Sequence, residues 1–159
     1  MTRCLLAITI AGLSLGCQQS PTVPKSASQP VVLTMAFSTK TFRRGKPDTI
    51  SVTATSTLAT EATIFFDNGC QILVTIRSDA GAAVVPPNGT PSCSPAVSKM
   101  VLPPKGTVVQ KFVWSGTDRF LPSGSSVTLP AGTYYISAAI NGANYSTFAP
   151  AVKVDLITQ

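Results

Sequence analysis

Residues 49–57 read TISVTATST, and this stretch decides the fold class. Apolar and polar side chains alternate along it, so that Ile50, Val52 and Ala54 fall on one face and the threonines on the other. A two-residue period is that of an extended strand with one buried and one solvated face. The stretch therefore predicts a β-strand that covers a core.

The same alternation recurs along the chain, with turn residues roughly every eight to twelve positions. Further strands are expected at residues 31–37, 62–66, 70–78, 98–102, 107–114, 133–141 and 151–156. There is no internal repeat and no helical periodicity of useful length. The pattern predicts an all-β domain at residues 31–159, an antiparallel immunoglobulin-like β-sandwich of about seven to eight strands. A jelly roll or a small barrel is the alternative.

One turn in this series carries a strong local signal. Asn68-Gly69 separates the strands expected at 62–66 and 70–78. Both residues tolerate positive φ, and Asn-Gly is the commonest two-residue hairpin turn. We therefore expect the two strands to pair as a hairpin.

Two aromatic residues are expected to serve the fold. Trp114 alternates with Phe112 on one strand, which favours a place in the core. Tyr134 follows a Pro-Ala-Gly turn at the start of another strand. Its hydroxyl is expected to make a corner hydrogen bond that fixes the entry of that strand.

The N-terminal segment has the pattern of a processing signal. Arg3 precedes an apolar run at residues 5–13, which is too short to span a bilayer, since that takes about 20 residues. The stretch LSLGC, which ends at Cys17, resembles the lipobox of bacterial lipoproteins. The resemblance implies a signal peptide at residues 1–16 and acyl chains, palmitate among them, on Cys17. The alternative is an ordinary secretory signal in which the cysteine is incidental.

A lipid anchor would place the protein on a membrane without spanning it. Residues 17–30 are rich in Pro, Ser and Gln and cannot bury enough apolar area to order themselves, so we expect a flexible tether. The residue after Cys17 is Gln18, and the lipoprotein sorting rule then implies the outer membrane, on its periplasmic or surface face. No later stretch approaches transmembrane length.

Cysteine usage predicts a single disulfide. Of the four cysteines, Cys4 would leave with the signal peptide and Cys17 would carry the lipid. Only Cys70 and Cys93 remain to pair, and an exported compartment permits the bond. The bond would hold the long Pro/Gly/Ser loop at residues 81–96 beside the Asn-Gly turn.

The composition argues against several functions. The chain has no histidine, so a Ser-His-Asp or Cys-His arrangement is impossible, and two thiols alone do not make a zinc site. No phosphate-binding glycine loop is present. Spacing alone leaves open a two-carboxylate glycosidase. We expect a protein that is not an enzyme and that uses no cofactor or metal.

The net charge is +6, but the basic residues do not form a stripe with aromatic residues, so nucleic acid is not an expected partner. The only local basic group lies at residues 43–46, in a segment that predicts a solvated turn. Contact with anionic lipid head groups is the alternative for that group.

Four stretches line up in order with the BsuPI-type intracellular proteinase inhibitor domain. They begin at Ala54, Leu102, Phe112 and Leu129 and read ATSTLATEATIFFDNGCQILVTIRSDAG, LPPKGT, FVW and LPAGTYYISAAI. The resemblance covers about residues 49–140 and implies an immunoglobulin-like sandwich that binds a protease. Aromatic residues occupy one loop of that family, whereas residues 82–99 here contain none.

We expect the binding surface to be the loop at residues 81–96, with Asn88 and Ser92, because a loop held by a disulfide loses less entropy on binding. Phe65 and Phe66 point to opposite faces of one strand, so one is expected in the core and the other exposed beside the loop. The expected function is that of a lipid-anchored envelope lipoprotein that binds a protein, as a proteinase inhibitor or toward another envelope protein.

Two alternatives stand beside this interpretation. The first is a structural component of the envelope that acts through its position on the membrane. The second is a carbohydrate-binding sandwich, which requires that Trp114 lie exposed with Tyr145 or Phe148.

Overall fold

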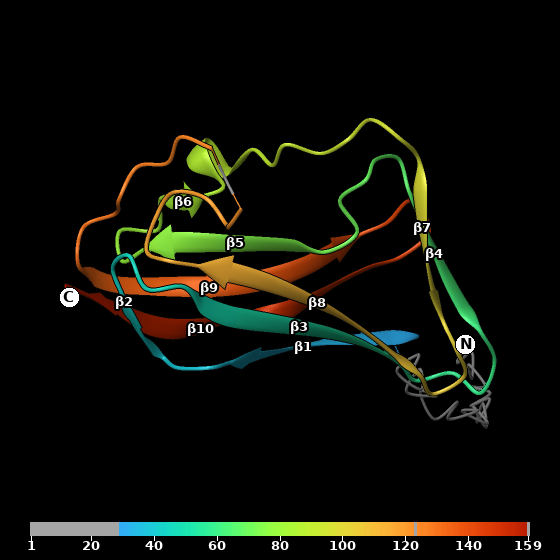
Figure 1. Ribbon diagram of the computed structural model, residues 1–159. Coiled ribbons are helices and arrows are strands. Elements are labelled where there is room, and N and C mark those ends of the chain that lie inside the picture. Colours follow the sequence, from blue (N-terminus) through green and yellow to red (C-terminus); the bar gives the residue numbers. More distant parts are fainter. Residues whose placement is uncertain (1–28, 123, 159) are drawn as a thin grey trace, which may run out of the picture.

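The computed structural model describes residues 29–122 and 124–158, and it confirms the all-β class (Figure 1). The strands and the single 3-10 helix are β1 (Val31–Phe37), β2 (Thr41–Arg43), β3 (Asp48–Ser56), β4 (Ala62–Phe66), β5 (Leu73–Ser78), β6 (Ala83–Val85), η1 (Pro87–Gly89), β7 (Ser98–Leu102), β8 (Thr107–Trp114), β9 (Gly132–Asn141) and β10 (Ser146–Ile157). The predicted signal peptide, Cys17 and residues 18–28 of the tether lie outside the described residues. Within the described part of the chain, no helix has the length and apolarity that crossing a membrane requires.

Two sheets form the sandwich. The smaller has the strand order β1-β3-β8 and the larger the order β2-β10-β9-β5-β6. These two orders are those of an immunoglobulin-like sandwich, as expected. The pairs are antiparallel, as expected, except that the short strand β2 runs parallel to β10. The ten strands exceed the expected seven to eight because β2 and β6 are only three residues long and lie in segments whose composition predicts turns.

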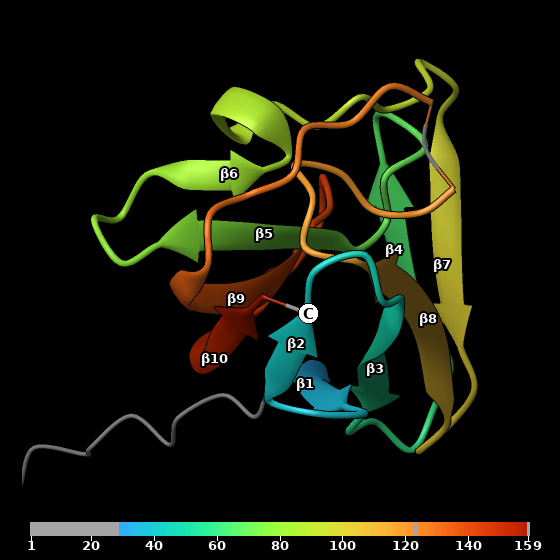
Figure 2. The same ribbon diagram turned by 60° about the vertical axis from the view of Figure 1, so that its left-hand side comes forward.

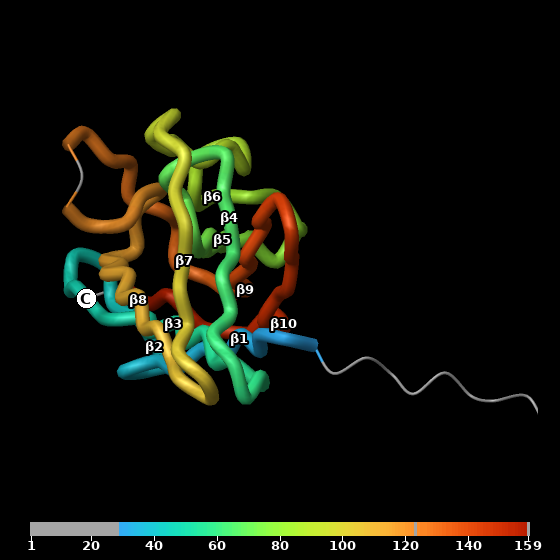
Figure 3. Tube along the Cα trace, turned by 90° about the vertical axis from the view of Figure 1, so that its right-hand side faces the viewer, coloured from blue at the N-terminus to red at the C-terminus, as the bar shows by residue number. Residues whose placement is uncertain are grey.

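A separate two-stranded ribbon, β4 with β7, stands across one end of the sandwich (Figures 1 and 3). The expected β4–β5 hairpin is wrong, because β4 pairs with β7 and β5 pairs with β9 and β6. Asn68 and Gly69 do not have positive φ. Instead, the Asn68 side-chain oxygen accepts a hydrogen bond from the Cys70 N–H at 2.9 Å. The turn therefore leads the chain out of the ribbon and into the larger sheet.

The core follows the predicted alternation. Ile50, Val52 and Ala54 of β3 are fully buried, and so are alternate residues of β9. Trp114 is fully buried against Phe42 of β2, with ring centroids 5.0 Å apart, and its Nε1 donates to the Thr117 carbonyl at 2.7 Å. The prediction for Trp114 is confirmed. Among the described residues, the members of the core lie between Val31 and Leu156.

The corner hydrogen bond is also confirmed. The Tyr134 hydroxyl donates to the Pro130 carbonyl at 2.7 Å, across the turn that begins β9. Burial raises the pKa of Tyr134, and the nearby positive charge of Arg44 lowers it by less. The buried hydroxyl thus stays neutral and keeps its donor role through the ordinary pH range.

Candidate binding surface

Cys70 and Cys93 form the predicted disulfide, with their Cα atoms 5.4 Å apart. The bond joins the chain just before β5 to the segment between η1 and β7. Next to it, the Gly69 N–H donates to the Ser94 carbonyl at 2.8 Å. We call residues 86–96 the pinned segment, because these two links hold its middle to the body of the domain.

The pinned segment runs from η1 to the ribbon along one side of the sandwich (Figure 2). On that side β8 is the last strand of the smaller sheet and β6 is the last strand of the larger one. No strand pairing joins the two sheets there among the described residues. The opposite side differs, because β1 lies against β10.

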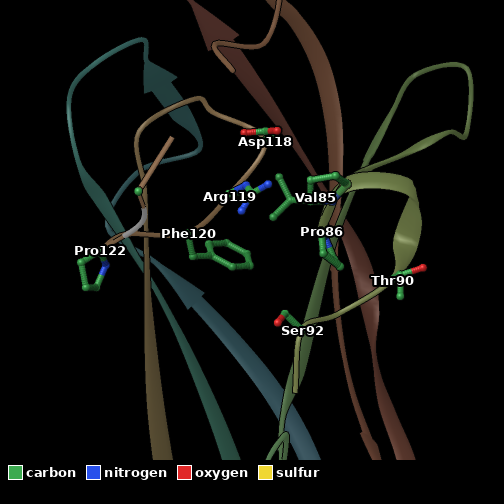
Figure 4. Close-up of a pocket in the computed structure, with 10 residues that line it drawn as sticks. Val85, Pro86, Thr90, Ser92, Asp118, Arg119, Phe120 and Pro122 are labelled. Carbon is green, nitrogen blue, oxygen red and sulfur yellow. The ribbon is translucent and has the colours of Figure 1, made fainter. Parts of the chain in front are cut away.

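Two hollows flank the pinned segment. The larger, of about 600 Å³, lies between the segment and the loop that follows β8. From that loop Arg119 and Phe120 reach toward Val85 and Pro86, with Ser92 at the lower rim (Figure 4).

The smaller hollow, of about 270 Å³, lies where β5 and β8 face each other across the open side. Leu73 and Val74 of β5 line it, together with Gln110 and Phe112 of β8. Ser92 and Phe120 line both hollows, so the two are neighbours on one surface.

The four residues predicted for the binding surface differ in their exposure and in whether they line the hollows. Ser92 is exposed and lines both hollows. Asn88 is exposed in η1 with φ of 57°, and it lines neither. Phe65 is 51% exposed, as one of the two phenylalanines should be. Phe66 is 1% exposed, so its place on a binding surface is wrong and it belongs to the core.

Phe65 lies in an apolar patch that the sequence did not reveal. On the ribbon it stands opposite Lys99; Val97 comes just before the first paired residue of β7, Ser98, and Val101 lies diagonally across the strand pair. These two valines are 78% and 38% exposed. We call Phe65, Val97 and Val101 the ribbon patch. It exists because β4 pairs with β7 instead of β5, and Val97 continues directly from the pinned segment.

Asn144 is a second residue that the sequence analysis missed. Its side chain accepts from the Phe65 N–H at 3.0 Å and donates to the Thr63 carbonyl at 2.9 Å. The turn between β9 and β10 is thereby attached to the ribbon. The backbone groups that Asn144 bonds are far from it in sequence, so no pattern of neighbouring residues indicates this role.

The polar groups of the surface suit recognition. The Asp118 carboxylate accepts from the Val127 N–H at 2.8 Å and so holds its own loop, while Arg119 is exposed. Among the described residues no three of His, Cys, Asp or Glu gather as a metal site. Aromatic rings and the arginine guanidinium, here those of Phe120 and Arg119, are enriched in protein interfaces.

The aromatic platform that the carbohydrate alternative requires is not formed. Trp114 is fully buried. Tyr145 is partly buried and its hydroxyl donates to the Val31 carbonyl at 2.7 Å. Phe148 alone of the three is open to solvent, at 72% exposure.

No protein-family model and no curated protein matches the chain. Several solved structures resemble it at low identity. One is the β-glucosidase EmGH1 of Erythrobacter marinus, at 13% identity, 80% of this chain, 15% of that chain and a TM-score of 0.47. Another is the alkylpurine DNA glycosylase AlkC of Pseudomonas fluorescens, bound to DNA containing an abasic site analogue. It matches at 10% identity over 80% of this chain and 30% of that chain, with a TM-score of 0.45.

A third is the CARDB domain of a Pyrococcus furiosus protein in complex with di-metal ions, at 12% identity, 80% of this chain, 91% of that chain and a TM-score of 0.41. The chain spans less than a third of the length of the first two. Because every one of these TM-scores is below 0.5, we transfer no activity, ligand or partner from these proteins.

Proposed function

We propose that this chain is an exported lipoprotein, anchored through Cys17, whose sandwich domain binds a protein through the pinned segment. The observation that carries the proposal is the disulfide between Cys70 and Cys93, which holds an exposed, proline-containing segment beside two hollows. Anchoring rests on the lipobox resemblance, and Gln18 favours the outer membrane of the cell envelope.

Pre-organisation is the physical reason why the disulfide would favour binding by the pinned segment. Each rotamer-rich side chain that becomes ordered on binding costs about 0.5–1.5 kcal/mol, and loop ordering adds to that cost. A segment whose middle is already fixed avoids part of the loss. The ribbon patch extends the same surface with exposed apolar area, which specific interfaces bury at their centre.

Proteinase inhibition is the finer form of this proposal, supported by the BsuPI resemblance. An inhibitor loop that is cut slowly must hold one conformation in the protease cleft, and a disulfide supplies that rigidity. The test is inhibition of a panel of serine proteases by residues 18–159, compared with the C70A/C93A variant. Inhibition by the first that disappears in the second is expected, and no inhibition of any protease would refute the inhibitor role.

Protein binding itself is tested by site-specific photo-crosslinking in the native envelope. A photoreactive amino acid at Ser92 should give a discrete crosslinked product. The same group at Thr34, an exposed position on β1, should not. Equal products from both positions, or none from Ser92, would contradict a binding role for the pinned segment.

The anchor has its own test. Radiolabelled palmitate should enter the full chain and be absent from Cys17→Ala, which should also leave the membrane fraction. If Cys17→Ala abolishes function while substitutions in the pinned segment do nothing, the protein is a structural component of the envelope instead.

A further inference from the structure

β8 has an uncovered edge. It is the last strand of the smaller sheet and is eight residues long; among the described strands it pairs with β3, and a single bridge from Leu121 to Val113 covers the far end of its other edge. The other strand at the open side, β6, has three residues and is followed by Pro86 and Pro87, which cannot donate to a neighbouring strand. Proteins normally shorten, twist or cover such edges, because they attract further strands.

The hydrogen bonds around β8 show which backbone groups face outward. The Leu121 N–H donates to the Val113 carbonyl at 2.8 Å, from the side away from β3. In an antiparallel strand the N–H and C=O of one residue point the same way and alternate with those of the next. The outward groups are therefore those of Thr107, Val109 and Lys111. In the described part of the chain no backbone group bonds to them.

The side chains of β8 point alternately toward the smaller hollow and toward solvent. Gln110 and Phe112 point inward and line the smaller hollow. Val109, 53% exposed, and Lys111 point outward to solvent. A strand added to the edge would place every second side chain over the hollow and the others beside Val109. Main-chain hydrogen bonds then supply affinity and the hollow supplies selectivity.

The unengaged charges near this edge are positive. Lys111 is exposed on the outer face of β8, and Arg119 is exposed at the far end, where the larger hollow begins. Asp118, which precedes Arg119 in the chain, directs its carboxylate to the Val127 N–H of its own loop. A segment that carries carboxylates beside an apolar residue complements this charge.

We propose that the edge of β8 receives an extended, acidic segment of a partner protein, which adds to the smaller sheet as a further strand and places an apolar side chain in the smaller hollow. This inference rests on the proposed function and names the class of ligand. The pinned segment and the added strand would then contact the partner from the two sides of the hollow.

The test begins with a phage library of random twelve-residue peptides, selected on residues 18–159. Synthetic copies of the selected peptides are titrated against the domain and three variants. Val109→Pro removes one outward N–H, and proline is tolerated where a strand N–H faces solvent. Val109→Ala is the matched control, because it trims the same side chain and keeps the N–H. Val109→Glu leaves the backbone intact and repels the carboxylates of the added segment, in case the proline variant does not fold.

Selected peptides should contain Asp or Glu and bind Val109→Pro and Val109→Glu at least tenfold more weakly, with Val109→Ala within threefold. N-methylation of the peptide should weaken binding at every second residue only. The amides of Thr107, Val109 and Lys111 should exchange with deuterium at least tenfold more slowly in the complex.

Failure to select any peptide, binding that Val109→Pro leaves unchanged, or equal effects of N-methylation at all positions would overturn the proposal. A dimer of the free domain that Val109→Pro dissociates would also overturn it, because a second copy would then occupy the edge. If the Ser92 crosslink persists in Val109→Pro, the edge proposal fails while protein binding by the pinned segment stands.

Discussion

Removal of the disulfide should destabilise the domain by about 3.4 kcal/mol. Cys70 and Cys93 are 23 residues apart, and the bond confines a loop of that length in the unfolded chain. The chain-entropy model assigns such a loop about −11.4 cal/mol/K, which is about 3.4 kcal/mol at 25 °C. Roughly 130 folded residues with about 2.1 cal/mol/K of unfolding entropy each then give a fall in Tm of about 12 °C for C70A/C93A.

The assay is guanidinium unfolding of residues 18–159, with the wild type oxidised and C70A/C93A in the same buffer. The m-value should rise in the variant, because the unfolded chain without the bond exposes more surface. Limited proteolysis of the native state should locate new cuts within the pinned segment. Ser94→Ala is the control, since it changes the same segment and leaves both cysteines.

A loss below 1 kcal/mol would refute the reasoning, because it would show that the bond barely constrains the unfolded chain. An unchanged cleavage pattern would refute a different step, the claim that the disulfide is what holds the pinned segment in place. In that case the Gly69–Ser94 hydrogen bond and the ribbon would suffice.

Three further substitutions test single contacts. Tyr134→Phe should lower the free energy of unfolding by about 1 kcal/mol at pH 7. Because the pKa of Tyr134 is raised in the folded state, the wild type loses stability above pH 10, where the unfolded tyrosine ionises. Chemical unfolding should therefore show a smaller difference in stability between wild type and variant above pH 10. Gly116→Ala should cost about 2 kcal/mol or more, since φ is +77° and the new Cβ would lie 2.7 Å from a Leu156 methyl; an unchanged Tm would contradict this. Asn144→Ala should cost about 1 kcal/mol and speed deuterium exchange at the Phe65 amide at least tenfold; equal rates would show that the side-chain bond does not hold that N–H.

Local alternation predicted the burial of single strands, because which face a side chain takes depends only on its own strand. Ile50 and Tyr134 were placed correctly on this basis, and the disulfide followed from elimination among four cysteines. Strand pairing depends on distant partners. The Asn68-Gly69 signal predicted a local hairpin, yet β4 pairs with β7, and neither turn residue has the positive φ that such a hairpin turn requires.

The parts of the surface that the sequence did not reveal all follow from that pairing. The ribbon patch needs β7 to lie beside Phe65, with Val101 diagonally across the strand pair and Val97 just before β7, which no spacing along the chain indicates. The edge of β8 is open because no described strand pairs with it on the side away from β3, and the sequence of β8 does not indicate this. Short strands such as β2 escaped notice because three residues are too few to show a period, although β2 carries the fully buried Phe42.

The proposed anchor would determine how tightly the edge of β8 must bind its proposed partner. Residues 17–30 can span at most about 50 Å when fully extended, so a lipid on Cys17 would keep the domain within that distance of its membrane. Partners held in the same membrane then meet the domain at an effective concentration that short tethers raise toward the millimolar range. A single added strand with micromolar affinity would be nearly saturated under these conditions. Release of the domain from the membrane should therefore lower the fraction of partner bound in the envelope, although the released domain keeps the same intrinsic affinity because the edge of β8, the hollows and the pinned segment are unchanged.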